Sequence, residues 1–224
     1  HGLTGWFTYF GEAGCVGAPL PFMSRGDGLP LQARGLTPAR AFPAAGLFGS
    51  LAAKSFVVTA RDIVDSDYNL RHCQGAERAA YEDLAGLAAA VEDAAKSGPE
   101  RKFIYAYWPD YDRVSHRYGS QSAEAAAQLA RIDEAFGRMI ARLQGTESVV
   151  IATADHGFVD VPPEHSLDLP EALCAMLRLP LCGEPERGKT WASRSKGADH
   201  HRPIQGMCSP VRLICRSSHK HLVA

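Results

Sequence analysis

The chain has 224 residues, of which 46% are hydrophobic, 22% charged and 8% aromatic, a composition typical of a globular protein with one sizeable core. Its 24 Lys and Arg residues nearly balance its 25 Asp and Glu residues, so no overall field attracts nucleic acid, and we expect no specific nucleic-acid binding. No apolar run reaches the roughly 18 residues that a membrane-spanning helix needs, so we also expect no membrane span.

Residues 1–50 hold ten of the 21 glycines and five of the 14 prolines. This density interrupts both helical and strand periodicity, so we expect a loop with short elements. A loop of this length is either a functional lid or a segment whose supporting elements lie outside the chain. Its aromatic cluster over residues 6–10 is expected to pack on the core or, alternatively, to line a ligand pocket.

A regular pattern follows residue 55. Residues 55–60 form an apolar run that predicts a strand, and the Ala-rich residues 76–96 predict a helix. Residues 102–108 predict a second strand. Apolar side chains three and four positions apart predict a long helix over 122–143, and a third apolar run predicts a strand over 148–154.

Strands and helices that alternate in this way, with continuously apolar strands, indicate a mainly parallel sheet flanked by helices. We therefore predict an α/β fold. Ligands of such sheets bind beyond the carboxyl ends of the strands. Polar clusters follow two of the predicted strands at that end, over residues 110–116 and 155–156.

The last part of the chain differs in composition. Residues 183–224 carry eight basic residues against three acidic ones, a surplus of five positive charges, and show little apolar periodicity. We predict an incomplete domain over 1–182 and a basic, atypical tail over 183–224 that is disordered or out of frame. A nucleic-acid-binding tail is the alternative.

The six cysteines contain no Cys-x-x-Cys pair, so we expect reduced, buried thiols and neither a zinc knuckle nor a thioredoxin-type motif. No initiator Met or signal peptide precedes His1. The compartment is therefore open, with the cytoplasm as the favoured expectation, and the oligomeric state is open as well.

Two carboxylate–imidazole pairs follow predicted strands. Asp112 and His116 are four residues apart, so a helical turn would let them share a cation. Asp155 and His156 are adjacent at the exit of the next predicted strand. Each pair alone is a weak signal, because Asp-x-x-x-His often occurs by chance and Asp-His-Gly can be an ordinary turn. Parallel strands, however, would bring the two pairs to one edge of the sheet. The sequence thus predicts a metal site.

These segments resemble a known family. Residues 108–119 (WPDYDRVSHRYG) resemble the Asp-x-x-x-His-x-x-Gly segment of the type I phosphodiesterase/nucleotide pyrophosphatase family, in the alkaline phosphatase superfamily. Residues 153–158 resemble its Asp-His-Gly motif, and residues 1–6 resemble the His-Gly stretch that follows its nucleophile helix. The resemblance covers residues 1–182 in order.

The resemblance implies that Asp112 and His116 bind one zinc ion and that Asp155 and His156 bind a second, with Mn or Fe as alternatives. It further implies hydrolysis of a phosphodiester or phosphoanhydride bond in a small-molecule phosphodiester or nucleotide, through a covalent phospho-Thr or phospho-Ser intermediate. Asp110 is expected beside the metal ligands or facing the substrate.

Tyr111, like Asp110, is expected beside the metal ligands or facing the substrate. The resemblance places the nucleophile and the first metal Asp upstream of His1, and a third His ligand far downstream. We therefore expect weak activity from the chain as given. His165 is interpreted as a surface residue or as a residue that contacts the metal ligands, and alternatively as a metal ligand itself. The remaining downstream histidines all lie in the tail, at positions 200, 201, 219 and 221.

Other activities stay open. A phosphomonoesterase, a sulfatase or a phosphomutase of the same superfamily would carry similar motifs. A formylglycine sulfatase would need a Cys-x-Pro-x-Arg motif, and residues 208–212 (CSPVR), in the tail, match that pattern. The alternative from a different class is a non-catalytic fragment or binding module in which the four residues bind one metal ion weakly.

Overall fold

Contacts within the computed structural model divide the chain into two compact units, one formed by Phe42–Asp160 and one by His1–Ala41 with Val161–Ala224. All four predicted metal ligands belong to Phe42–Asp160. His165 lies outside the described residues, as does the predicted tail apart from 212–214. The described residues are 6–158, 160, 166–168, 170–174, 176–177, 179, 182 and 212–214.

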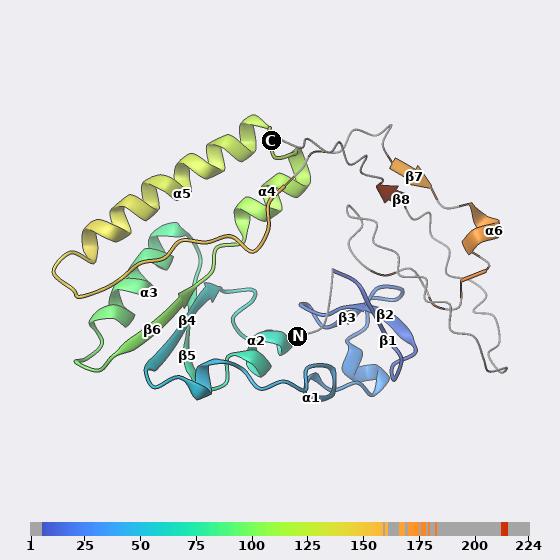
Figure 1. Ribbon diagram of the computed structural model, residues 1–224, viewed down its shortest axis with the longest axis horizontal. Coiled ribbons are helices and arrows are strands. Elements are labelled where there is room, and N and C mark those ends of the chain that lie inside the picture. Colours follow the sequence, from blue (N-terminus) through green and yellow to red (C-terminus); the bar gives the residue numbers. More distant parts are fainter. Residues whose placement is uncertain are drawn as a thin grey trace, which may run out of the picture. The chain divides into compact units, whose positions relative to one another are not determined.

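The unit Phe42–Asp160 is built on a parallel sheet (Figure 1). Its described strands are β4 (Lys54–Ala60), β5 (Ala76–Tyr81) and β6 (Lys102–Ala106). β4 lies in the middle and pairs in parallel with both of its neighbours. Helices flank this sheet, which confirms the predicted α/β class.

Two long helices lie on one side of the sheet (Figure 1). α3 (Leu84–Lys96) packs on all three strands, and α5 (Ala123–Arg142) packs on α3 and on α4 (Asp110–Tyr118). α5 confirms the helix predicted over 122–143. It begins after Ser122, whose hydroxyl accepts a hydrogen bond from the backbone N–H of Ala125 at 3.1 Å.

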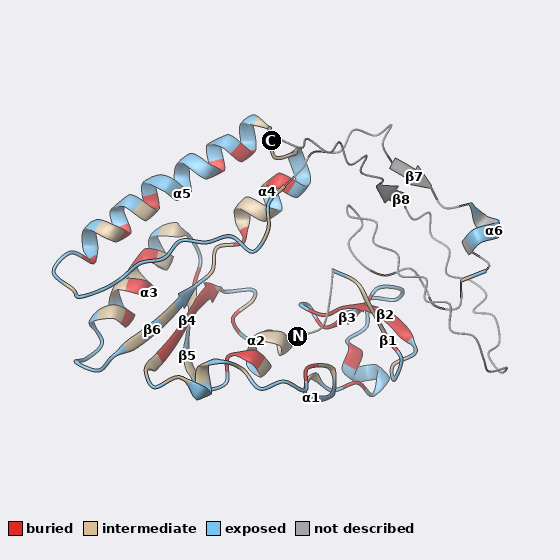
Figure 2. Cartoon of the chain, in the orientation of Figure 1, coloured by how far each residue is buried: buried red, intermediate tan, exposed pale blue. Residues whose placement is uncertain are grey.

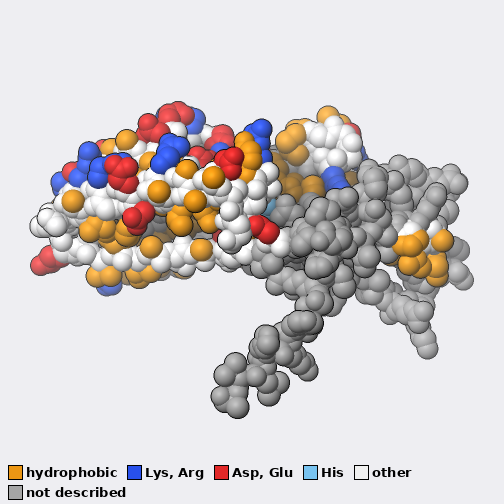
Figure 3. All heavy atoms as spheres, turned by 90° about the horizontal axis from the view of Figure 1, so that it is seen from above, with side chains coloured by type: hydrophobic (Ala, Val, Ile, Leu, Met, Phe, Trp, Pro, Cys, Tyr) orange, Lys and Arg blue, Asp and Glu red, His pale blue; other side chains and the backbone are white. Residues whose placement is uncertain are grey.

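The core lies between the sheet and these helices. Val58 in the middle of β4 is fully buried, because a central strand has neighbours on both edges and layers on both faces. Figure 2 shows the buried side of α5 turned toward α3 and its other side exposed. Figure 3 shows positive and negative side chains interspersed on the surface of this unit. On α5, Arg138 forms an ion pair with Glu134. The buried cluster consists of Val58, Tyr81, Ala88, Val91, Met139 and Leu143.

Residues 76–96, predicted as one helix, form a strand and then a helix. The Ala, Glu and Arg residues of β5 favour a helix locally, but each residue of β5 pairs with a residue of β4. Tertiary pairing therefore overrides the local propensity. α3 begins only after Asp83, whose carboxylate accepts a hydrogen bond from the backbone N–H of Gly86 at 2.7 Å.

The strand predicted over 148–154 is wrong, because the structure assigns no strand to these residues. Val149 and Ile151 are 88% and 82% exposed, so the apolar run is not buried. An apolar run indicates a tendency to extend, but a strand also needs a neighbour that offers backbone hydrogen bonds. The strand predicted over 102–108 is present and ends two residues early, as β6.

The remaining elements are β1 (Thr8–Phe10), β2 (Cys15–Ala18), β3 (Met23–Ser24), η1 (Leu31–Arg34), α1 (Pro38–Ala41), η2 (Phe48–Ser50), α2 (Asp67–His72), β7 (Ser166–Asp168), α6 (Glu171–Cys174) and β8 (Arg212–Ile214). β1, β2 and β3 form one antiparallel sheet, and β7 pairs with β8 in a second one. None of the helices in the described part of the chain has the length and apolar character required to cross a membrane.

Candidate metal centre

Helix α4 carries the first carboxylate–imidazole pair. Asp110 and Asp112 lie in its first turn, where the partial positive charge of the helix N-terminus stabilises negative side chains. Residues four apart lie on the same face of a helix. Asp112 Oδ1 is accordingly 3.2 Å from His116 Nε2. The helical turn that the shared-cation hypothesis required is therefore present.

The second pair lies on a segment without helix or strand. His156 Nε2 is 3.4 Å from Asp112 Oδ1 and 3.8 Å from Asp155 Oδ1. The Asp155 carboxylate also accepts a hydrogen bond from the backbone N–H of His156 at 3.0 Å. The structure thus brings Asp112, His116, Asp155 and His156 together. Their role as metal ligands stays a prediction.

Asp112 Oδ1 is the atom on which this cluster converges. It is buried and has no hydrogen-bond partner among the described residues, although the Nε2 atoms of His116 and His156 lie within 3.4 Å of it. A buried carboxylate oxygen without a hydrogen bond is costly, and a bound cation would offset that cost. Two ligands at about 2.0–2.1 Å from a tetrahedral ion are roughly 3.3 Å apart. The separations of 3.2 and 3.4 Å fit this value.

The cluster is not a complete metal site as it stands. Among the residues that the structure describes, no group of three or more His, Cys, Asp or Glu side chains is arranged to hold a metal ion. The pairwise fit concerns Asp112 and the two imidazoles, whereas the Asp155 side chain is 77% exposed. The donor atoms suit Zn²⁺, Mn²⁺ or Fe in their chemistry. Closing the site would require Asp155 to turn inward.

Phe158 packs against both imidazoles. Its ring centroid is 5.1 Å from that of His156 and 5.3 Å from that of His116, with the rings steeply inclined. The ring of Tyr111 also contacts Phe158, at 6.0 Å. Edge-to-face contacts of this kind stabilise aromatic clusters and fix ring orientation. Phe158 was not among the residues predicted for the site. Its position two residues after His156 is the feature of the sequence that would have suggested it.

Negative charge accumulates around the centre. Burial raises the pKa of Tyr105 and of Tyr107, and the negative charge of Asp155 raises both pKa values further. The charge of Asp112 also raises the pKa of Tyr107. Burial is the larger cause for both phenols, and the carboxylates add to it because they place negative charge beside the centre.

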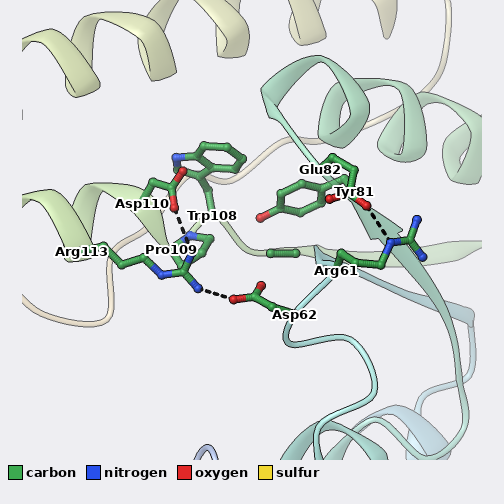
Figure 4. A pocket seen from close by; sticks show the side chains of 9 residues that line it. Arg61, Asp62, Tyr81, Glu82, Trp108, Pro109, Asp110 and Arg113 are labelled. Carbon is green, nitrogen blue, oxygen red and sulfur yellow. Dashed lines mark hydrogen bonds and ion pairs between the residues drawn. The ribbon is translucent and has the colours of Figure 1, made fainter.

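A cavity of about 230 Å³ lies at the carboxyl ends of β4, β5 and β6, where open α/β sheets commonly bind ligands. In Figure 4 the Arg113 guanidinium lies between two carboxylates, 2.8 Å from Asp62 and 3.2 Å from Asp110. Asp110 thus lines this cavity and pairs with Arg113. Sequence analysis missed Asp62, although its position just after a predicted strand was a usable signal.

Comparison with known proteins agrees with the resemblance of the motifs. The family model described as "Type I phosphodiesterase / nucleotide pyrophosphatase" matches residues 41–185. "Alkaline phosphatase PhoD" of Zymomonas mobilis is 43% identical over 58 residues, and "Alkaline phosphatase PhoK" of a Sphingomonas species is 36% identical over 59 residues. Each match covers 25% of this chain and only 10% and 11% of the two relatives. No solved structure gives a significant match.

Proposed function

Because the chain belongs to the type I phosphodiesterase/nucleotide pyrophosphatase family, we propose that it contributes the metal centre of a hydrolase of phosphodiester or phosphoanhydride bonds. The observation that supports this most strongly is the convergence of two imidazole nitrogens on the buried Oδ1 of Asp112. The carboxylate and imidazole donors match the ligands that Zn²⁺ takes in catalytic sites.

Four side chains would hold the ions in this proposal. Asp112 and His116 would bind one Zn²⁺ and Asp155 and His156 a second, with Mn²⁺ or Fe as alternatives. Bound ions would polarise the phosphoryl group and stabilise the departing oxygen. The Phe158 ring, which contacts both imidazoles, would help to hold them in orientation.

The substrate would be a small phosphodiester or a nucleotide. The cavity at the ends of the three strands lies next to α4, whose residues Asp110 and Arg113 line it. A substrate part beyond the phosphate could occupy this space. Hydrolysis by the chain is expected to be slow, because the four donors include no hydroxyl that could attack phosphorus.

The direct test is Zn²⁺ affinity, measured by competition with a chromogenic chelator. Loss of a residue that hydrogen-bonds a metal ligand typically weakens metal binding roughly 10- to 100-fold. We expect His156→Ala, which removes a ligand itself, to weaken Zn²⁺ binding by more than this. Asp133→Ala, which removes an exposed carboxylate from α5, is the control and should bind as the unmodified chain does. Equal affinity of all three proteins would contradict the proposal.

A second candidate is phosphomonoester hydrolysis, because both curated relatives are named alkaline phosphatases. Hydrolysis of a nitrophenyl phosphodiester and of nitrophenyl phosphate, each with Zn²⁺, separates the two activities. A preference for the diester supports the first candidate, and a preference for the monoester supports the second. Zn²⁺ binding with neither activity would favour a non-catalytic binding module.

A further inference from the structure

The turn between α4 and α5 leaves backbone donors that neither helix uses. α4 ends at Tyr118 and is capped by Gly119, which has φ 91° and donates its N–H to the carbonyl of Ser115. α5 begins after Ser122. The N–H groups of Ser120 and Gln121 lie between these caps, beyond the reach of either helical ladder, so they need other acceptors.

The Asp160 carboxylate accepts hydrogen bonds from both donors. Its Oδ1 is 2.8 Å from the N–H nitrogen of Ser120, and its Oδ2 is 3.1 Å from that of Gln121. Hydrogen bonds from the backbone, chiefly from Ser120, lower the pKa of Asp160. The φ of 91° at Gly119 favours glycine, and a Cβ there would lie in ordinary van der Waals contact with Asp160 Oδ2, at 3.4 Å.

Asp160 lies four residues after His156. Its hydrogen bonds therefore tie the segment that carries the second predicted pair to the turn that follows the first pair. The described residues 153–158 and 160 of that segment form no helix or strand. Side-chain contacts with distant parts of the sequence include those of His156, of the Phe158 ring and of the Asp160 carboxylate.

We propose that Asp160 is a positioning residue that clamps this segment onto the α4–α5 turn and thereby holds His156 beside Asp112. The effect on metal affinity rests on the proposed function, whereas the clamp itself does not. The clamp acts through the turn, because the Asp160 carboxylate bonds the backbone N–H groups of Ser120 and Gln121. It joins positions 40 residues apart in sequence, which neither motif alone can bring together.

Three measurements on Asp160→Ala test the proposal. We expect the Ser120 and Gln121 amides to exchange with solvent about tenfold faster, since each loses its acceptor. In metal-free protein the NMR resonances of the His156 ring should shift and broaden, because the ring is no longer held. Zn²⁺ affinity should fall about 10- to 100-fold, as for loss of an outer partner of a metal ligand.

Asp160→Asn keeps one acceptor oxygen, so it should lie between the unmodified chain and Asp160→Ala in all three measurements. Asp133→Ala serves as the charge control on exposed α5 and should change none of them. Thermal unfolding of each variant identifies any loss of the fold, in which case Asp160→Asn replaces Asp160→Ala as the test.

The outcomes separate the clamp from the metal. Faster amide exchange with unchanged His156 resonances would overturn the proposal, because the hydrogen bonds would then hold only the turn. Shifted His156 resonances with unchanged Zn²⁺ affinity, while Asp112→Ala abolishes binding, would also overturn it. If Asp112→Ala leaves Zn²⁺ affinity unchanged, the proposed function has failed, and the His156 resonances alone decide whether Asp160 positions that ring.

Discussion

The two halves of the candidate centre are held in different ways. Asp112 and His116 lie on α4, where backbone hydrogen bonds of a regular helix fix their spacing. Asp155 and His156 lie on a segment without regular structure, which contacts of Phe158 and Asp160 hold in place. Helix geometry alone therefore places Asp112 beside His116. The position of Asp155 and His156 depends on contacts of residues that follow them in the sequence, Phe158 and Asp160.

The largest effect is expected from breaking the helical half. Ser115→Pro in the interior of α4 removes a backbone N–H and introduces a steric clash, which costs about 3 kcal/mol or more. Zn²⁺ binding should be lost with it, because Asp112 and His116 would no longer face each other. Unfolding in urea and chelator competition measure the two effects.

Ser115→Ala is the matched control for this prediction. The Ser115 hydroxyl is buried and has no hydrogen-bond partner among the described residues, so its removal should change the free energy of unfolding little. A proline variant that binds Zn²⁺ as well as the alanine variant does would show that the helix is not what organises this half.

The next effect concerns the half held by side chains. Phe158→Ala removes the ring that contacts both imidazoles, so Zn²⁺ affinity should fall about 10- to 100-fold. The free energy of unfolding should change less than in Ser115→Pro. Phe158→Leu keeps much of the packing volume and should fall in between. Equal Zn²⁺ affinity of the unmodified chain, Phe158→Ala and Phe158→Leu would show that the Phe158 ring does not hold His156 in place.

A smaller effect is expected at the connection into α4, where the Tyr81 hydroxyl donates a hydrogen bond to the carbonyl of Tyr107. Tyr81→Phe should lower the free energy of unfolding by about 1 kcal/mol near neutral pH, with Zn²⁺ affinity unchanged. Loss of metal affinity in this variant would mean that the helical half also depends on a side-chain tether.

The same variant tests a pH dependence. Burial raises the pKa of Tyr81 well above 10, and the charge of Asp110 raises it further. The unfolded chain therefore loses this proton first, so the contribution to stability is complete below about pH 10 and decreases as the pH rises above that value. Denaturant unfolding from pH 8 to 11 should show a shallower alkaline decline for Tyr81→Phe than for the unmodified chain. Parallel declines would contradict this assignment.

The smallest effect is expected at the ion pair of Asp62 with Arg113 on α4. Both side chains are more than half exposed, so Asp62→Ala should cost less than about 1 kcal/mol. Zn²⁺ affinity should not change, since α4 is held by its backbone. A clear loss of affinity would show that surface ion pairs orient the helix.

The sequence was sufficient to predict the elements that local patterns define. The apolar residues of β4, the periodic side chains of α5 and the four-residue spacing of Asp112 and His116 all indicated the structure that formed. Each of these patterns expresses geometry within one element. The predicted α/β class followed from them. The two carboxylate–imidazole pairs meet as expected, but not for the expected reason, because residues 148–154, before the second pair, form no strand.

Features that depend on distant partners could not be predicted in the same way. β5 is a strand because β4 offers it a partner, whereas the more apolar residues 148–154 form none. The contacts of Phe158 and Asp160 join segments about forty residues apart. No local periodicity encodes such a contact, so the sequence predicted which residues meet at the centre and missed what holds them there.

The proposed metal centre requires that Asp112, His116, Asp155 and His156 hold divalent cations. Anomalous X-ray diffraction at the zinc edge, from crystals grown with Zn²⁺, locates such ions directly. We expect a peak at about 2.0–2.2 Å from Asp112 Oδ1 and from an imidazole nitrogen of His116 or His156. An anomalous map without a peak at these side chains, or with its peaks only elsewhere on the molecule, would contradict it.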